Sequence, residues 1–303
     1  MKHLIKRNEL KFLAMVVLGL LLAGSLSLAS GGAGFVGNEK CKECHEAVSA
    51  SHGKSLHGRA WSDKGEGYGC ESCHGAASDH VNNPSRSNIV SYGKHANSAV
   101  KDQNKQCLEC HGASKAMAFW ASGKHKKEDV SCSACHDVHT ANKPAVREPE
   151  VCFTCHKDIR SQANKFSHHP IIEGKIKCSD CHNPHGSLGH GMLRDENVNQ
   201  LCYRCHADKR GPYVWEHPPV EENCMKCHAA HGTKAAKLLI EKQPQLCQNC
   251  HDWSNHPGTP YGANASFNTT SFGRGGLGRG CTPCHGTIHG SNAPGTAGKR
   301  FVR

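Results

Sequence analysis

Every cysteine of this 303-residue chain belongs to one motif, Cys-x-x-Cys-His, which occurs ten times. The first cysteines of the motifs are Cys41, Cys70, Cys107, Cys132, Cys152, Cys178, Cys202, Cys224, Cys247 and Cys281. The second cysteines are Cys44, Cys73, Cys110, Cys135, Cys155, Cys181, Cys205, Cys227, Cys250 and Cys284. No cysteine is left over, so the chemistry of this motif constrains the fold more than any other feature of the sequence.

The spacing inside the motif matches the attachment chemistry of a c-type haem. Two thiols three residues apart lie on one helical turn, where they can form thioethers with the two vinyl groups of one porphyrin. The next residue places an imidazole beneath the iron as an axial ligand. The predicted proximal ligands are His45, His74, His111, His136, His156, His182, His206, His228, His251 and His285. The motif therefore predicts ten covalently bound c-type haems.

Structural zinc sites and a disulfide framework are the two alternatives that 20 cysteines raise. Zinc does use Cys-x-x-Cys pairs, but it typically takes two pairs per ion and does not require a histidine directly after each pair. A disulfide framework gives no reason for that histidine either. All ten pairs are followed by histidine, which favours haem over both alternatives.

The composition predicts that something other than side chains fills the interior. Apolar residues make up 37% of the chain, but this figure includes the 20 cysteines. Without them too little apolar material remains for the core of a conventional 300-residue domain. This argues against a TIM barrel, a doubly wound nucleotide-binding fold and a β-sandwich. We expect a multihaem cytochrome c fold, in which short α-helices and irregular loops wrap an elongated file of ten haems with little or no β-sheet.

Histidine is abundant enough to supply the second axial ligand of each iron. The motifs at Cys132, Cys178 and Cys224 start 46 residues apart, and each has one histidine upstream and another three residues after its own. Looser copies at both ends extend the pattern to five units. The predicted distal ligands are His57, His80, His125, His139, His169, His185, His217, His231, His256 and His289. The surplus histidines are His52, His95, His168 and His190. Methionine is scarce, so bis-His ligation is the expected scheme.

The histidines three residues after a proximal ligand have a geometric restriction. On a helical turn, residues i and i+3 lie on the same face. His139, His185 and His231 therefore cannot reach the far side of the haem held by their own motif. We expect each of them to bind a neighbouring haem, which would hold consecutive haems close together.

The first 29 residues read as an export signal. A basic start is followed by a continuously apolar stretch over residues 12–23 and by small residues, with cleavage expected after Ala29. We expect two structurally continuous pentahaem halves beyond it, over residues 30–165 and 166–303. The formal charge of +11 is misleading, because two propionates per haem reverse it. No basic patch interleaved with aromatic residues indicates nucleic-acid binding.

Four segments carry a resemblance to a known family. They are LCYRCHADKRGPYVWEHPPVEENCMKCHAAHG at 201–232, CSDCHNPHGS at 178–187, QPQLCQNCH at 243–251 and CHGTIHGSN at 284–292. The chain resembles the MtrA/PioA/MtoA family of periplasmic decahaem cytochromes, related to DmsE. The family's pattern of distal ligands falls on the same ten histidines that the internal repeat selects. The lead-in between Ala29 and Cys41 is short, which resembles the Fe(II)-oxidising, MtoA-like branch.

The resemblance implies an electron-transfer protein rather than an enzyme. Such cytochromes sit inside an outer-membrane β-barrel porin and pass electrons between periplasmic cytochromes and extracellular iron, in some cases through extracellular cytochromes. We expect this role at the outer membrane, with Fe(II) oxidation favoured and metal reduction possible in the same scheme. The alternative is a soluble periplasmic shuttle that feeds a terminal reductase. A multihaem reductase is a third reading, but it needs an open iron, and here distal histidines are in surplus.

Replacement of one predicted distal ligand tests the assignment. We expect His217→Met to raise the potential of one haem, because Met/His ligation gives higher potentials than bis-His ligation, while covalent haem content stays at ten. A redox titration with optical spectra measures the change. An unchanged titration and spectrum would mean that His217 is not a ligand.

Overall fold

The computed structural model describes residues 34–61, 68–93, 95–140, 146–251 and 280–302. These residues form short helices and loops, and no strand occurs among them. The only extended pairing they contain is four isolated β-bridges, such as that between Ser167 and Thr233. The predicted fold class is therefore confirmed. The proposed export signal and His256 lie outside the described residues.

The helical segments are short and follow one another closely. The α-helices are α2 Asn38–Gly53, α3 Leu56–Trp61, α4 Cys70–His74, α5 Ser78–Asn82, α6 Val100–His111, α7 Lys124–Lys127, α8 Glu150–Phe153, α9 Lys157–Ala163, α10 Cys178–Cys181, α11 Val198–Tyr203, α12 Pro218–Glu222, α13 Gln245–Gln248 and α14 Gly295–Lys299. The 3₁₀ turns are η1 Arg86–Asn88, η2 Lys115–Met117, η3 Trp120–Ser122, η4 Cys132–Ala134, η5 His190–Met192, η6 Ala207–Lys209, η7 Cys224–Lys226 and η8 Ala236–Leu238. No described helix is long and apolar enough to traverse a bilayer.

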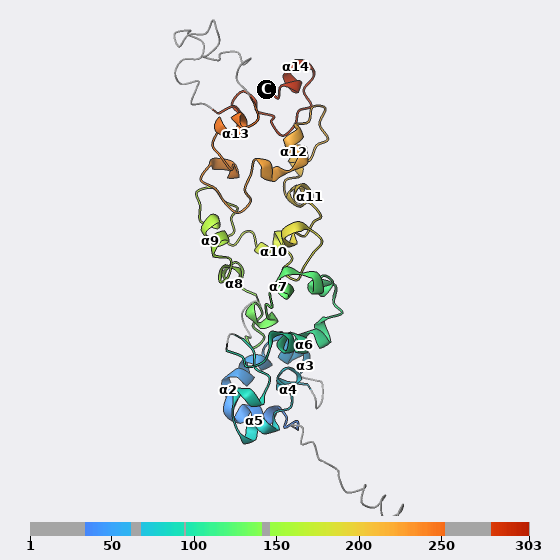
Figure 1. Ribbon diagram of the computed structural model, residues 1–303, viewed down its shortest axis with the longest axis vertical. Helices are drawn as coiled ribbons and strands as arrows, with labels where there is room; N and C mark the ends of the chain where they lie inside the picture. Colours follow the sequence, from blue (N-terminus) through green and yellow to red (C-terminus); the bar gives the residue numbers. More distant parts are fainter. Residues whose placement is uncertain (1–33, 62–67, 94, 141–145, 252–279, 303) are drawn as a thin grey trace, which may run out of the picture.

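The molecule is a column in which position along the axis follows the sequence. Figure 1 shows α2 to α6 at one end and α12 to α14 at the other, with the colours running in order between them. The chain passes repeatedly between two sides of the column as it advances, with α8 and α9 on one side and α7 and α11 on the other. Sites attached to successive motifs are therefore laid out in sequence order along the axis.

A backbone hydrogen bond closes the Cys-x-x-Cys-His motif into one helical turn. The backbone N–H of the motif histidine donates to the carbonyl of the first cysteine, at 2.9 Å for His136 and His182 and 3.0 Å for His228. One such bond closes a helical turn, which brings the two thiols to one side of the backbone. After the turn the chain usually leaves the helical conformation, as at His182, where ψ is 147°.

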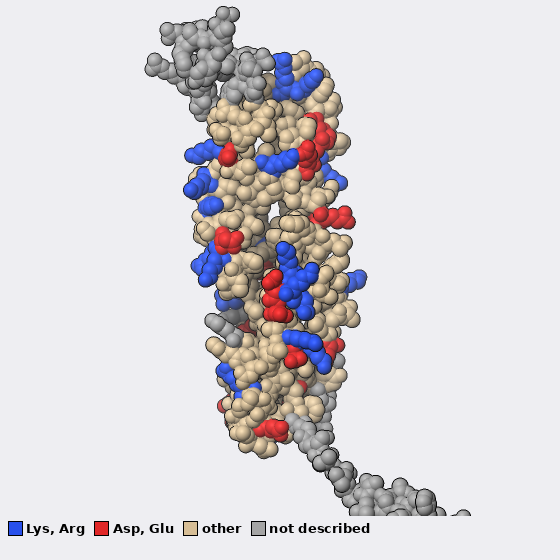
Figure 2. All heavy atoms as spheres, in the orientation of Figure 1, with Lys and Arg blue, Asp and Glu red and all other residues tan. Residues whose placement is uncertain are grey.

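Few side chains pack into an apolar interior. The buried apolar residues of the described chain are Ala77, Trp120, Phe153, Ala163, Ile171 and Ala235. Three of them, Phe153, Ala163 and Ile171, form one cluster with Ile159 and Ile176 packed against it. Figure 2 shows openings between the two sides of the column that side chains leave unfilled. The side chains alone do not make a core, which agrees with the composition.

The 46-residue period of the sequence is also a structural period. Nδ1 of His182 lies 3.0 Å from the carbonyl oxygen of Gly191, and Nδ1 of His228 lies 3.0 Å from that of Lys237. His182 forms a β-bridge with Leu193, and His228 forms the matching bridge with Leu239. In both copies the chain takes positive φ at the same place, 67° at Gly191 and 59° at Lys237. His182 and His228 are thus each held by the turn that follows the motif.

The thin core gives a prediction about the protein without its cofactor. Produced where cytochrome c maturation is absent, the chain should have a free energy of unfolding well below the ~5 kcal/mol at the lower end for native domains, because the buried side-chain area is too small. Circular dichroism and amide hydrogen exchange would measure this against the matured protein. A cooperative thermal transition in the haem-free chain would contradict it.

Candidate functional site

Histidine rings face one another in pairs along the whole column. Each pair joins a predicted proximal ligand to a predicted distal ligand, with ring centroids 5.9 to 6.4 Å apart. The nine pairs of the described residues are His45–His80, His74–His139, His111–His57, His136–His185, His156–His125, His182–His231, His206–His169, His228–His289 and His251–His217. The predicted ligand sets are therefore brought together in space, although ligation itself stays a prediction.

The separation of the rings fits one iron atom between them. An imidazole nitrogen lies ~2.0 Å from a bound transition metal, and the ring centre lies roughly 1 Å further out, so two rings on opposite sides of a metal have centres ~6 Å apart. Rings in direct van der Waals stacking would be closer. The described pairs leave room for one metal and one flat macrocycle, which is what bis-His haem ligation requires.

Backbone carbonyls orient many of the rings. Nδ1 lies within hydrogen-bond distance of a carbonyl oxygen at His74 (Val90, 2.8 Å), His80 (Ser85, 2.9 Å), His125 (Pro184, 2.9 Å), His169 (Ala230, 2.7 Å), His182 (Gly191, 3.0 Å), His228 (Lys237, 3.0 Å) and His285 (Arg300, 2.7 Å). A carbonyl oxygen only accepts, so Nδ1 must carry the hydrogen in each case. The lone pair of Nε2 is then available to a metal, and the ring cannot rotate freely.

The surroundings favour the neutral imidazole that a metal requires. Burial lowers the pKa of His136, and the nearby His185 and His111 lower it further. Burial also lowers the pKa of His231, where His182 adds to the effect. A deprotonated Nε2 is the ligand form, so a lowered pKa reduces the competition of protons with the metal.

The thiols of consecutive motifs meet in twos. The first cysteines interact in the pairs Cys41–Cys70, Cys107–Cys132, Cys152–Cys178, Cys202–Cys224 and Cys247–Cys281. We call two motifs joined in this way a doublet, and the five doublets are numbered along the chain. Burial first, and then Cys224, raises the pKa of Cys202 to about 12. The first cysteines are half-buried, so each attachment point is partly shielded from solvent.

Cysteines of neighbouring doublets also lie near one another. Cys73 of the first doublet lies near Cys107 and Cys110 of the second, and Cys135 of the second lies near Cys155 of the third. The series continues with Cys181 near Cys205 and Cys227 near Cys247 and Cys250. The attachment points therefore form one unbroken series in sequence order.

The ring pairs cross between doublets in both directions. His57 of the first doublet faces His111 of the second, while His139 of the second faces His74 of the first. The same exchange occurs at the other three junctions, through His125 and His185, His169 and His231, and His217 and His289. At the first end the pair His45–His80 stays inside its own doublet. As the i+3 spacing required, no such histidine faces the ring of its own motif in the described chain.

The sequence did not predict three features of the structure. The sequence did not say which distal histidine faces which proximal one, because this depends on contacts between distant motifs. It left His52 as surplus, yet its ring lies 6.2 Å from that of His139 and 6.1 Å from that of Trp61. The sequence also did not predict which backbone carbonyls accept hydrogen bonds from the histidine rings. Another surplus residue, His168, instead bonds to the Lys165 carbonyl and lies 3.0 Å from a Glu173 oxygen.

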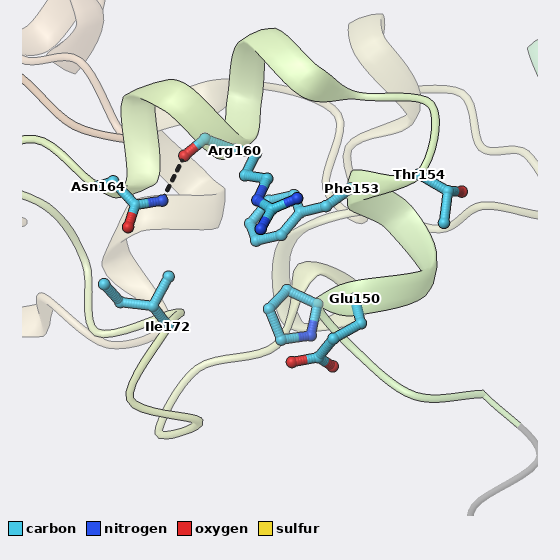
Figure 3. A pocket seen from close by; sticks show the side chains of 7 residues that line it. Glu150, Phe153, Thr154, Arg160, Asn164 and Ile172 are labelled. Carbon is cyan, nitrogen blue, oxygen red and sulfur yellow. Dashed lines mark hydrogen bonds between the residues drawn. The ribbon is translucent and has the colours of Figure 1, made fainter.

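Two other features of the described chain are not separate sites. Glu148, Cys152 and Cys178 could together hold an ion, but both cysteines belong to the third doublet. A surface pocket of about 270 Å³ lies beside α8 and includes Phe153, Arg160 and Ile172 in its lining. Figure 3 shows the side chains that line this pocket, and none of the paired histidines is among them.

Comparisons with known proteins agree with this geometry. Residues 168–211 and 217–256 match the doubled CXXCH motif family, and residues 70–148 match the family of NrfB-like cytochrome c-type proteins. The multiheme cytochrome MtrA of Shewanella baltica is 38% identical over 280 residues, which cover 88% of this chain and 81% of that protein. The C-type polyheme cytochrome OmcB of Geobacter sulfurreducens is 25% identical over 211 residues, which cover 60% of this chain and 27% of that protein.

Removal of one facing ring should open one iron. We expect His185→Ala to make about one tenth of the reduced haem bind carbon monoxide, because His136 then has no partner across 5.9 Å and the motifs number ten. His190→Ala, which removes a surplus histidine from the same segment, should bind none. Carbon monoxide difference spectra measure both. Equal spectra for the two variants would show that His185 is not an axial ligand.

Proposed function

Because the chain belongs to the MtrA family of multihaem c-type cytochromes, which are electron-transfer proteins rather than enzymes, we propose that it is a decahaem conduit for electrons. In this proposal each of the ten motifs holds one haem, and every iron has two histidine ligands. The remaining pair is His285 with His256, which would stay inside the fifth doublet as His45–His80 does in the first. The branch within the family is proposed to be the MtoA-like one.

The observation that carries the proposal is the unbroken series of ring pairs and thiol contacts. Nine pairs of rings at the spacing of a bis-ligated metal follow one another along the column. An enzyme would need at least one iron with a free position for substrate. All nine proximal rings that have a described partner face a second histidine, so the geometry supports transfer of electrons and gives no support to bond chemistry at the iron.

The thiols, the imidazoles and the backbone carbonyls would each have a different role in holding a haem. When bound, each haem supplies an iron that cycles between the ferric and ferrous states. The thiols would hold the haem covalently. The two imidazoles of each pair would serve as its nitrogen ligands, which would leave no position at the iron for a substrate. The carbonyls behind Nδ1 hold the rings in orientation and increase their donor strength.

We further propose that the column lies within an outer-membrane β-barrel porin, in a protein exported to the periplasm. Figure 2 shows Lys, Arg, Asp and Glu side chains along the whole length of the visible face, with no broad uncharged belt. Loops and short helices also leave backbone groups that lipid cannot satisfy. A polar barrel interior removes both difficulties. Residues 30–165 and 166–303 would then form two continuous pentahaem halves, since the Phe153–Ala163–Ile171 cluster packs across their boundary.

The proposed partners follow from the position of the two ends of the column. One end would exchange electrons with periplasmic cytochromes, and the other with extracellular iron or an extracellular cytochrome. Fe(II) oxidation is the favoured direction and metal reduction is possible. A soluble periplasmic shuttle to a terminal reductase is the alternative, and it would need no barrel.

Isolation of the native complex tests the proposal. The tagged full chain, captured from detergent extracts of outer membranes, should bring down a large β-barrel protein in a stable complex, and its mass should include ten covalent haems. A tagged periplasmic monohaem cytochrome is the control for non-specific capture. Recovery of the chain as a free periplasmic protein would instead support the shuttle.

A further inference from the structure

A polar side chain just before the first motif of each doublet reaches the start of the second motif. The five residues are Asn38, Asn104, Glu148, Asn199 and Gln243, and we call them the clamp residues. Resting on the ten-haem attachment proposed above, we propose that the clamp residues set the relative position of the two haems of each doublet, and so the electronic coupling between them. They are positioning residues, since they act through the motif turns.

Asn199 shows the clamp in its fullest form. Its Oδ1 accepts a hydrogen bond of 2.8 Å from the backbone N–H of Cys224, which begins the second motif of the fourth doublet. Its Nδ2 donates to the carbonyls of Val220 and Glu221, at 2.9 and 2.8 Å. The residue is only 8% exposed. One largely buried amide therefore holds the turn from two sides.

Two other asparagines repeat this arrangement. Oδ1 of Asn104 accepts from the N–H of Cys132 at 2.8 Å, and its Nδ2 donates to the Val130 carbonyl at 3.2 Å. Asn104 is 3% exposed. Oδ1 of Asn38 accepts from the N–H of Cys70 at 2.9 Å, and its Nδ2 donates to the Tyr68 carbonyl at 3.2 Å. In all three doublets the acceptor bonds the first cysteine of the partner motif.

The third and fifth doublets use a longer side chain from one residue further back. Glu148 accepts from the N–H of Ser179 at 2.8 Å. Gln243 accepts from the N–H of Thr282 at 3.2 Å and from its hydroxyl at 3.1 Å. Both bonds reach the residue after the first cysteine of the partner motif. The longer side chain, placed one residue earlier in the sequence, thus also links the two motifs of its doublet.

Each clamp residue lies close in sequence to the first cysteine of its own motif. The asparagines stand three residues before the first cysteine of their own motif, and Glu148 and Gln243 stand four before theirs. The three asparagines lie in α2, α6 and α11 and share a helix face with that cysteine, whereas Glu148 and Gln243 precede α8 and α13. The bond then spans 25 residues from Asn199 and 28 from Asn104. Each clamp is a short rigid link between two first cysteines that are distant in sequence and in contact in space.

That link bears directly on the cofactors. Each haem would be bonded to the sulfur atoms of its motif, so a shift of one turn moves its haem against the neighbouring one. A side chain that merely capped the second turn would affect stability alone. A clamp that sets the separation and orientation of two haems also determines their exciton coupling, which appears as a couplet in the circular dichroism of the Soret band.

The test compares Asn199→Ala with Asn197→Ala in the full matured protein. Asn197 belongs to the same segment and its Oδ1 caps α11 by accepting from the N–H of Gln200 at 2.9 Å, so its replacement removes a local hydrogen bond of the same helix and none to the partner motif. We expect Asn199→Ala to keep ten haems by mass and to lose part of the Soret couplet. Asn197→Ala should keep the wild-type couplet.

A second pair of variants covers the case in which Asn199→Ala does not mature. Glu148→Gln keeps an acceptor for Ser179, and Gln243 already serves in this position in the fifth doublet, so this variant should keep the couplet. Glu148→Ala should reduce it. Wild-type couplets in both alanine clamp variants, with ten haems present, would overturn the clamp. A wild-type protein with fewer than ten covalent haems would instead contradict the proposed attachment, so the two failures are distinguishable.

Discussion

Two imidazole rings from different motifs, held about 6 Å apart, are the contact on which the rest of this molecule depends. A hydrophobic core would normally fix the relative positions of distant segments, but the described chain has few buried apolar residues, and half of these are alanines. The ring pairs take over that task. Since each pair draws on two motifs, the bound metal would cross-link the chain at every pair. The same metal–histidine bonds would then stabilise the fold and support electron transfer, so a change in these bonds would affect both.

The pattern of these cross-links accounts for the elongated shape. Every junction between doublets is crossed by two histidines, one given forward and one given back, and each reaches only the adjacent doublet. In the first doublet the pair His45–His80 stays within the doublet. Links that join only nearest neighbours build a linear array, as in repeat proteins. A globule would need contacts between distant doublets, and the cofactor chemistry supplies no reason for them.

The sequence predicted this molecule where the chemistry is local and fell short where it is not. The Cys-x-x-Cys-His turn is closed within five residues, so the attachment points and the helix-and-loop fold class could be predicted from spacing. The period of 46 residues pointed to His185 and His231 as ligands, and their i+3 position excluded their own haems. It could not say that His185 faces His136, because that depends on the second and third doublets lying side by side. The clamp residues were missed for the same reason, since Asn199 and Cys224 are 25 residues apart.

Histidine exchange and clamps act at different joints, and together they account for every joint of the column. Exchange joins one doublet to the next, whereas the clamp joins the two motifs inside a doublet. At each described junction, the histidine between the two motifs of one doublet faces the first motif of the next doublet. The histidine after the second motif faces the second motif of the preceding doublet. The exchange therefore gives no direct link between the two first cysteines of one doublet. The clamps supply that link, because a side chain from the first motif's segment accepts a hydrogen bond from a backbone N–H of the second motif. Since each clamp joins only the two motifs of one doublet, a haem-free chain would still lack the links between doublets, and these would form only when histidines of neighbouring doublets bind the same metal.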